Sequence, residues 1–387
     1  MNTIGVCNQE DLIKWLTLTT IKGVTPREWL DVIEKNSISL DHLFTGNWQP
    51  QVNHQAELPE KLAQLIRAAD LQRIEQSLEW QSQETLNQLV SIDCSSYPEM
   101  LKQLCSPPLV LFVRGNERLI SQPSIALVGS RRCTHAGKQI AQEFARQLAE
   151  LGWSVVSGLA TGIDAAAHQG ALHGQAKTIA VTGTGPDKIY PARNQKLHHS
   201  IVEQGGTIVS EFWPGTPPRA CHFPRRNRII AALSTGTVVI EAAIKSGTLI
   251  TANLAIDLGR EVFAVPGNIY NSTSEGCHHL IQQGAKLVFK VEDIIEEFAC
   301  VPSQLALQGV DESQKSPCEN LATDELLDSV DFDVTAVDVI AERNKLSVSE
   351  VLATLLEYEL RGCVAAVPGG YVKLRGKKNV RHPHVSI

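Results

Sequence analysis

The 387-residue chain lacks several features that would assign it to a familiar class. Its nine cysteines include no C-x-x-C pair, so neither a disulfide framework nor a zinc finger is indicated. No apolar run approaches the roughly 18 residues of a membrane span, and the N-terminus is acidic where a signal peptide needs a basic start. We therefore expect a cytoplasmic protein with reduced thiols and no membrane span.

Motifs of nucleotide, metal and hydrolytic chemistry are also missing. G-S-R-R-C-T at 129–134 stands where an NAD site needs G-x-G-x-x-G, and 183–190 lacks the lysine and hydroxyl of a Walker A motif. Histidines occur as adjacent pairs at 198–199 and 278–279. Two adjacent histidines cannot lie on the same face of a helix, as zinc-binding histidines do. No G-x-S-x-G elbow occurs. We expect no cofactor, no metal and no catalytic residue.

The composition that remains is that of an ordinary globular protein, with 43% apolar and 20% charged residues. Its length allows two or three domains. The net charge of −7 argues against indiscriminate coating of nucleic acid. A local basic groove stays open, because binding follows local potential rather than total charge.

The chain divides into zones by texture. Residues 1–88 have a helical pattern, and L-T-T-I-K-G-V-T at 18–25 resembles the turn of a helix-hairpin-helix, although a plain packing module fits as well. Residues 300–320 have the composition of a linker. Residues 321–375 combine helices with a small hairpin, as in a winged helix, and 376–387 form a basic tail.

Between 89 and 299, short Val- and Ile-rich runs alternate with amphipathic helical stretches. This alternation predicts an α/β fold with a doubly wound parallel sheet covered on both faces. The expected strands are PSIALVGS, WSVVSG, KTIAVTGT, GTIVSEF, TGTVVIEA, REVFAVPG and KLVFKV.

Ligands of such sheets bind beyond the carboxyl ends of the strands, where this sequence gathers glycines, hydroxyls and arginines. So many anion donors suit an extended phosphate backbone better than one small nucleotide. The candidate binding residues are Gly129, Ser130, Arg131, Ser157, Gly158, Arg193, Arg219, Phe223, Arg225, Arg226, Asn227, Lys245 and Thr248.

Simpler interpretations stay open at several positions. A Gly-Ser turn after a strand can be only a tight turn, and Asp164 can simply favour a helix dipole. Arg228 can pair internally with Glu211 or Glu241, and Phe223 can cap the apolar face of the following helix.

The blocks GSRR, SGLATGIDAAAH, YPARN, SEFWPGTPP, FPRRNRIIAALS, EAAIKSGTLITA and GREVFAVPG resemble, in order and spacing, the DNA-processing protein A family (DprA, also called Smf). The resemblance is dense over residues 95–298. It implies an extended Rossmann-like domain that binds and protects single-stranded DNA and loads RecA against single-strand-binding protein in natural transformation. It also implies a homodimer and a non-enzymatic role.

The sequence departs from the family at three places. Thr161 stands where many relatives have a basic residue, which removes one phosphate contact, and Ala232 replaces a usual glycine. Arg193 carries its charge one position later than the family's lysine.

Two other functions are weighed against the mediator. A nucleotide-5′-monophosphate phosphoribohydrolase-like enzyme would need P-G-G-x-G-T-x-x-E, which the segment ending at Glu241 lacks. A winged-helix regulator would read duplex DNA through SVSEVLATLLEYEL, whose Glu350, Glu357 and Glu359 suit phosphates poorly.

Overall fold

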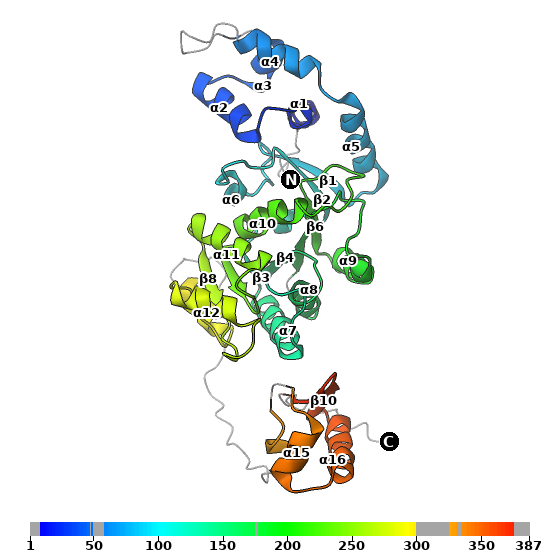
Figure 1. The fold of residues 1–387 in the computed structure, drawn as a ribbon. Helices are drawn as coiled ribbons and strands as arrows, with labels where there is room; N and C mark the ends of the chain where they lie inside the picture. The colour runs from blue at the N-terminus through cyan, green and yellow to red at the C-terminus, as the bar shows by residue number, and fades with distance from the viewer. Residues whose placement is uncertain are drawn as a thin grey trace. The chain divides into compact units, whose positions relative to one another are not determined.

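The computed structural model describes residues 8–46, 48, 58–174, 177–298, 325–331 and 334–374. The chain divides into two compact units, one up to residue 302 and one from residue 303 (Figure 1). The expected linker at 300–320 and the tail at 376–387 lie outside the described residues. Among the helices that are described, none has the length and apolarity needed to cross a membrane.

The first unit begins with a helical module. Its α2 starts at a proline and is closed by a capping box, in which the Glu28 carboxylate accepts the Thr25 N–H at 2.6 Å. The start of α2 therefore already holds an internal carboxylate, where a helix-hairpin-helix would offer its amides to a phosphate. Buried Trp15, Trp29 and Trp80 belong to the core of this module. Its helices are α1 (Gln9–Thr20), α2 (Pro26–Asn36), α3 (Leu40–Thr45), α4 (Leu58–Arg67) and α5 (Leu71–Gln83).

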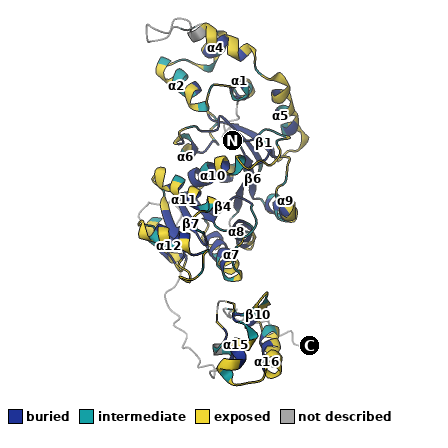
Figure 2. Cartoon of the chain, in the orientation of Figure 1, coloured by how far each residue is buried: buried dark blue, intermediate teal, exposed yellow. Residues whose placement is uncertain are grey.

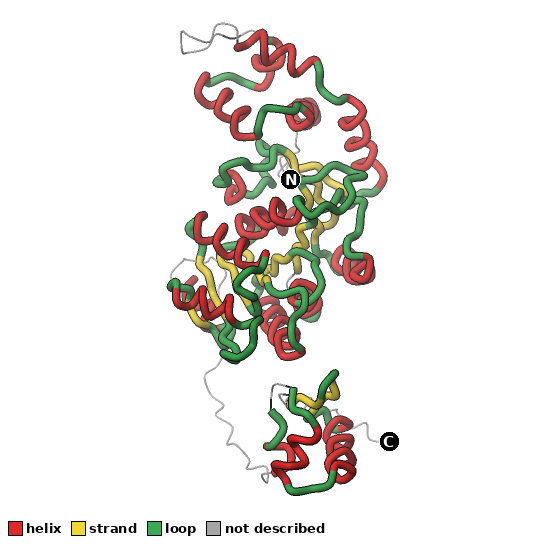
Figure 3. Tube along the Cα trace, in the orientation of Figure 1, coloured by secondary structure: helices red, strands yellow, loops and turns green. Residues whose placement is uncertain are grey.

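Within the described residues, the strands of this unit form one nine-stranded sheet in the order β1-β2-β6-β5-β4-β3-β7-β8-β9. Figure 3 draws the strands in yellow. From β6 to β9 all neighbours are parallel, which confirms the expected parallel sheet. The strands are β1 (Asn87–Ser91), β2 (Val110–Gly115), β3 (Ser124–Val128), β4 (Ser154–Ser157), β5 (Thr178–Val181), β6 (Thr207–Ser210), β7 (Gly236–Val239), β8 (Glu261–Ala264) and β9 (Lys286–Leu287).

The sequence analysis missed β1 and β2, which add an antiparallel edge to the sheet. An 18-residue connection that holds the short α6 (Glu99–Lys102) separates these two strands. The sequence therefore contains no tight-turn motif that would predict their pairing. The 3₁₀ helix η1 (Glu117–Ser121) then leads into β3.

Helices cover both faces of the sheet because buried side chains alternate along the strands. Ile125 and Leu127 of β3 pack with α7 and α8, whereas Ala126 and Val128 pack with α10 and α11. The remaining elements of the unit are α7 (His135–Glu150), α8 (Ile163–Leu172), η2 (Ala192–Asn194), α9 (Gln195–Glu203), α10 (His222–Leu233), α11 (Gly247–Asp257), α12 (Glu275–Gln282), α13 (Glu292–Ile295) and η3 (Glu296–Phe298).

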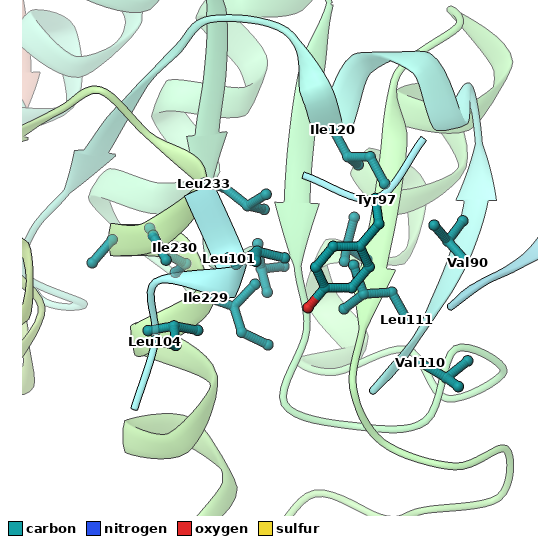
Figure 4. Packing of buried hydrophobic residues seen from close by; sticks show 14 of the residues in the cluster. Val90, Tyr97, Leu101, Leu104, Val110, Leu111, Ile120, Ile229, Ile230 and Leu233 are labelled. Atoms are coloured by element: carbon teal, nitrogen blue, oxygen red, sulfur yellow. The ribbon is translucent and has the colours of Figure 1, made fainter. Parts of the chain in front are cut away.

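The apolar half of α10 anchors the arginine-rich half. Figure 4 shows Ile229, Ile230 and Leu233 of α10 beside Leu101 and Leu104, in the cluster that also holds residues of β1 and β2. All five side chains are nearly or fully buried. This packing fixes α10 along the sheet and so fixes the arginines at its first turns.

The second unit has the helix-helix-hairpin order of a winged helix, as expected. Val351, Leu355 and Tyr358 of α16 belong to its small core, whereas Leu352 and Leu356 are exposed. Figure 2 accordingly colours part of α16 as exposed. Its elements are α14 (Glu325–Asp328), α15 (Val337–Asn344), α16 (Val348–Leu360), β10 (Val364–Val367) and β11 (Gly370–Lys373).

Candidate functional site

The carboxyl ends of the parallel strands bring most of the candidate residues to one edge of the sheet. β3 lies between β4 and β7, so the strand order reverses direction beside it, and ligands of open α/β sheets bind at such a switch point. The turns after β3, β4, β5, β6 and β7 all end at this edge. Some of the candidate side chains point into the protein there, and others point out.

Arg226 points inward. Its side chain is 4% exposed, and its Nη1 donates to the carbonyl oxygens of Gly158 and Val181, the residues at the ends of β4 and β5. Nε donates to Asn227 Oδ1 at 3.0 Å. A Cβ at Gly158 would lie 2.6 Å from the Arg226 guanidinium, so the glycine makes room for it. Arg226 therefore ties α10 to two strands.

Two buried titratable groups surround this arginine. Burial raises the pKa of the Asp164 carboxyl, against the opposing influence of Arg226, and burial lowers the pKa of Arg226 to about 10. His168 is fully buried, and its Nδ1 lies 2.8 Å from the Thr178 hydroxyl. Burial, with a smaller contribution from the charge of Arg226, lowers the pKa of His168 to about 3. The histidine is therefore neutral at physiological pH.

Glu241 fills the start of α7, the first helix after β3. Its carboxylate accepts the Thr134 N–H at 2.9 Å and the Thr134 hydroxyl at 2.5 Å. Its backbone carbonyl accepts the Ser130 N–H at 2.7 Å. In a dinucleotide-binding sheet, the helix after the first strand binds a pyrophosphate at its N-terminus. Here a carboxylate of the chain itself occupies that position.

Glu211 holds two other arginines of the cluster. Its side chain is only 2% exposed, with Arg228 Nη2 in ion-pair contact and Arg225 Nε at 3.1 Å. Arg228 also donates to the Ser106 carbonyl at 2.8 Å. The internal role considered for Arg228 is thus confirmed, with Glu211 as its partner. Arg225 remains 58% exposed and can reach a ligand as well.

Phe223 and Tyr190 form an outward-facing aromatic pair. Their ring centroids lie 5.5 Å apart, and the Arg131 guanidinium lies 5.3 Å from the Phe223 ring. A Cβ at Gly183 would be 3.0 Å from Phe223, so this ring also packs on the turn after β5. Tyr190 is 42% exposed. The pair brings together the turns after β3, β5 and β6.

The remaining candidates line the same edge. Arg131, Arg193, Arg219 and Lys245 are exposed, and none forms an ion pair with another described residue. The helix α11 begins at Gly247 without a side-chain cap, next to Lys245 and Thr248. Asn227 Nδ2 donates to the Gly247 carbonyl at 3.4 Å and so links the starts of α10 and α11. Free amides at such a helix start favour anions.

Four expectations about these residues need correction. Ser157 is fully buried and donates to the Leu127 carbonyl at 2.7 Å, and Gly158 faces Arg226. The Ser130 amide is bonded to Glu241 instead of being free for an anion. Arg226 is an internal arginine rather than a surface phosphate contact.

Gly129 and Thr161 also have packing roles. A Cβ on Gly129 would lie 2.6 Å from Ile163 Cγ1, so this glycine permits close packing of β3 against α8. The Thr161 hydroxyl donates to the Arg131 carbonyl at 3.4 Å and braces the turn that presents Arg131.

Sequence reasoning missed Tyr190 as a site residue and the position of Glu241 at the start of α7, whereas it did consider Glu211 as a partner of Arg228. Tyr190 sits in the quoted YPARN block, where only the arginine was weighed. Glu211 directly follows β6, and Glu241 lies just after β7, at the edge of the sheet where the candidate residues gather.

Replacing Arg226 tests its internal role. Arg226→Ala leaves two buried carbonyl oxygens without a donor, at about 1–3 kcal/mol each, so we expect a loss of about 2–6 kcal/mol in the free energy of unfolding. Urea titration measures it. Arg225→Ala is the matched control, with an expected change below about 1 kcal/mol because the Arg225 side chain is 58% exposed and Glu211 keeps Arg228 as its ion-pair partner. A loss below about 1 kcal/mol for Arg226→Ala would contradict the role.

The buried histidines predict how stability depends on pH. Burial also lowers the pKa of His198, to about 4. Each unfolded histidine binds a proton near pH 6.5 that the folded state excludes until pH 3–4. Stability should therefore fall below pH 6.5 by about 1.4 kcal/mol per pH unit for each histidine. Urea titrations between pH 7 and 5 should give about half that pH dependence in His168→Gln. An unchanged dependence would exclude His168 as a source.

Comparisons with known proteins identify the family of this chain. The sequence model of DNA recombination-mediator protein A matches residues 88–299, and that of the DprA winged helix domain matches residues 311–370. Protein Smf of Escherichia coli is 41% identical over 374 residues, which cover 93% of this chain and 98% of the relative.

Two solved structures are also similar. The X-ray structure of DNA processing protein A from Streptococcus pneumoniae is 37% identical with a TM-score of 0.64, covering 74% of this chain and 97% of that one. DNA processing protein A from Helicobacter pylori, described for its single-stranded DNA binding mode, is 32% identical with a TM-score of 0.50, covering 55% and 95%. The chain belongs to the DNA recombination-mediator protein A family, also known as DprA or Smf.

Proposed function

We propose that this protein binds single-stranded DNA at the carboxyl edge of its sheet and acts there as a recombination mediator that loads RecA. The observation that carries the proposal is the aromatic pair of half-buried Phe223 and exposed Tyr190 beside the Arg131 guanidinium. Aromatic faces bind unstacked bases without regard to sequence, and neighbouring cations bind the backbone. A duplex keeps its bases stacked and offers no free face to such a pair.

The exposed cations around the pair supply the phosphate contacts. Arg193, Arg219 and Lys245 lie after three different strands and have no internal carboxylate partner among the described residues. Arg225 shares the buried Glu211 and remains exposed. Together with the uncapped start of α11, these groups suit a line of phosphates rather than one.

The same edge disfavours the enzyme alternative. A phosphoribohydrolase needs an accessible carboxylate in its glycine-rich loop, but Glu241 is 8% exposed and accepts two hydrogen bonds from Thr134. Freeing this carboxylate would uncap α7. We therefore propose a non-enzymatic protein.

The winged-helix unit offers little to duplex DNA. The outer side of α16 carries Val348, Leu352 and Leu356, all at least 42% exposed, where a recognition helix presents polar and basic side chains. Residues 321–374 include ten acidic and four basic side chains. Repulsion from phosphates makes duplex reading by this helix unfavourable.

RecA and single-strand-binding protein are the partners that the family resemblance implies. A mediator binds the strand first and exchanges it, so we propose that the protein resists displacement by single-strand-binding protein and then hands the strand to RecA. The cytoplasm, where these proteins meet DNA, is the proposed location.

We also propose a homodimer through α11. Ile250 and Ile256 of α11 and the nearby Ile244 are 45–51% exposed. Ile250→Glu places a charge in this apolar surface and should convert the dimer into a monomer, because a buried unpaired charge is strongly unfavourable. Light scattering after gel filtration measures the mass, with Leu151→Ala as a surface control. A monomeric wild type, or a dimeric variant, would contradict this interface.

Binding of labelled oligonucleotides over a salt series tests the main proposal by fluorescence anisotropy. Phe223→Ala should weaken binding to single strands by about 1–3 kcal/mol, the contribution of one stacked base. Arg131→Ala should reduce the slope of log K against log salt by about 0.7. Arg118→Ala, an exposed arginine before β3 at the opposite edge, is the control and should bind like the wild type. Equal affinity for duplex and single strand, or no effect of Phe223→Ala, would refute the proposed site.

A further inference from the structure

The loop after β8 exposes two large side chains side by side. Tyr270 is 92% exposed and Ile269 is 73% exposed. This loop is not among the segments of the proposed DNA site. A tyrosine with one ring edge in water and both faces free is a suitable platform for a base.

The loop is braced rather than loose. Asn268 Oδ1 accepts the Tyr270 N–H at 3.0 Å, and Asn271 Oδ1 accepts the Thr273 N–H at 3.0 Å. His278 Nε2 lies 3.0 Å from the Gly267 carbonyl oxygen. These bonds hold the backbone on both sides of Tyr270, so less conformational entropy is lost when its ring binds a ligand.

Hydrogen bonds connect this loop to the turn that carries Arg131. The Thr273 carbonyl accepts the Ala242 N–H at 2.6 Å, and the preceding residue, Glu241, accepts the Ser130 N–H through its backbone carbonyl at 2.7 Å. In the sheet, β7 lies between β3 and β8, so the ends of those two strands are about 10 Å apart. Tyr270 therefore belongs to the same edge of the sheet as Arg131.

Cations lie in the loops between the two aromatic positions. Arg132 follows β3 and Lys245 follows β7, and both are exposed without an ion pair to any described residue. A DNA backbone that runs from the Phe223–Tyr190 pair past Arg131 would pass these two charged side chains before it reached the end of β8. The phosphates between two stacked bases need such neutralisation.

We propose that Tyr270 is a second base-stacking platform, which extends the single-stranded DNA track from the Phe223–Tyr190 pair across β7 to the end of β8. This inference rests on the proposed function and adds to it the direction and the length of the track. The strand then crosses the switch point of the sheet instead of ending there.

The test compares oligothymidylates of about 5 and about 15 nucleotides, which bracket the usual footprint of such sites, on the full-length protein. Tyr270→Ala should weaken binding of the longer oligonucleotide about five- to fiftyfold, and that of the shorter one much less, because one stacked base is lost from the far end only. Tyr270→Phe keeps the ring and should restore the affinity for the longer strand. Leu151→Ala, which removes an exposed apolar side chain elsewhere, should change neither affinity.

A second measurement does not depend on any substitution. Ultraviolet cross-linking of a 5-bromouracil-substituted 15-mer to the wild-type protein, followed by peptide mass spectrometry, should label the peptide that contains Tyr270. No label there, with equal affinity of Tyr270→Ala and wild type for the longer strand, would overturn the extension.

Phe223→Ala separates the failure of this inference from that of the proposed function. If Phe223→Ala loses binding at both lengths while Tyr270→Ala loses none, the proposed site stands and the extension is wrong. If the wild type binds neither oligonucleotide, the proposed function falls and this inference falls with it.

Discussion

The buried guanidinium of Arg226 is the interaction on which the candidate site depends. A charge removed from water must be compensated, and here two strand-end carbonyls, Asn227 and the nearby Asp164 do so. Because the compensating carbonyls belong to Gly158 and Val181, the start of α10 has one possible position relative to β4 and β5. Phe223 and Arg225 lie within the same turn of α10, so the inward arginine determines where its outward neighbours stand.

The protein also uses its own carboxylates at places where nucleotide-binding sheets place phosphates. Glu241 occupies the start of α7, and Glu211 draws Arg228 and part of Arg225 inward. The deep part of the edge is therefore electrostatically satisfied without a ligand. Within the part of the chain that the structure describes, the groups at this edge that still lack an ion-pair partner are on its outer side, namely the exposed arginines, and the Phe223–Tyr190 pair lies beside them. A shallow rim accommodates a strand that passes through, whereas a deep pocket would hold a single nucleotide.

The helices and strands with a periodic apolar pattern were predictable from the sequence. The pairing of β1 with β2 and the contacts of individual side chains were not. Alternation of apolar runs with amphipathic helices predicted the parallel sheet, because burial on both faces leaves that pattern. The β1–β2 edge lacked a turn signal and was missed. Arginines at the strand ends identified the site, but a guanidinium has the same sequence signature whether it points in or out. Only tertiary contacts showed that Arg226 bonds to the carbonyls of Gly158 and Val181 and that Arg131 lies over the Phe223 ring. Tyr190 was passed over because a lone aromatic in a loop has no periodic context.

The net charge of −7 is compatible with this site because of how the charge is distributed. Acidic residues outnumber basic ones in the winged-helix unit, whereas Arg131, Arg193, Arg219 and Lys245 at the sheet edge have no carboxylate partner among the described residues. Interactions beyond about 8 Å are screened at physiological salt, so a strand at the proposed site would respond chiefly to the cations within that distance and little to the net charge of the chain. The proposed preference for single strands therefore rests on the local cations and on the neighbouring aromatic rings, and the net charge of the chain does not oppose it.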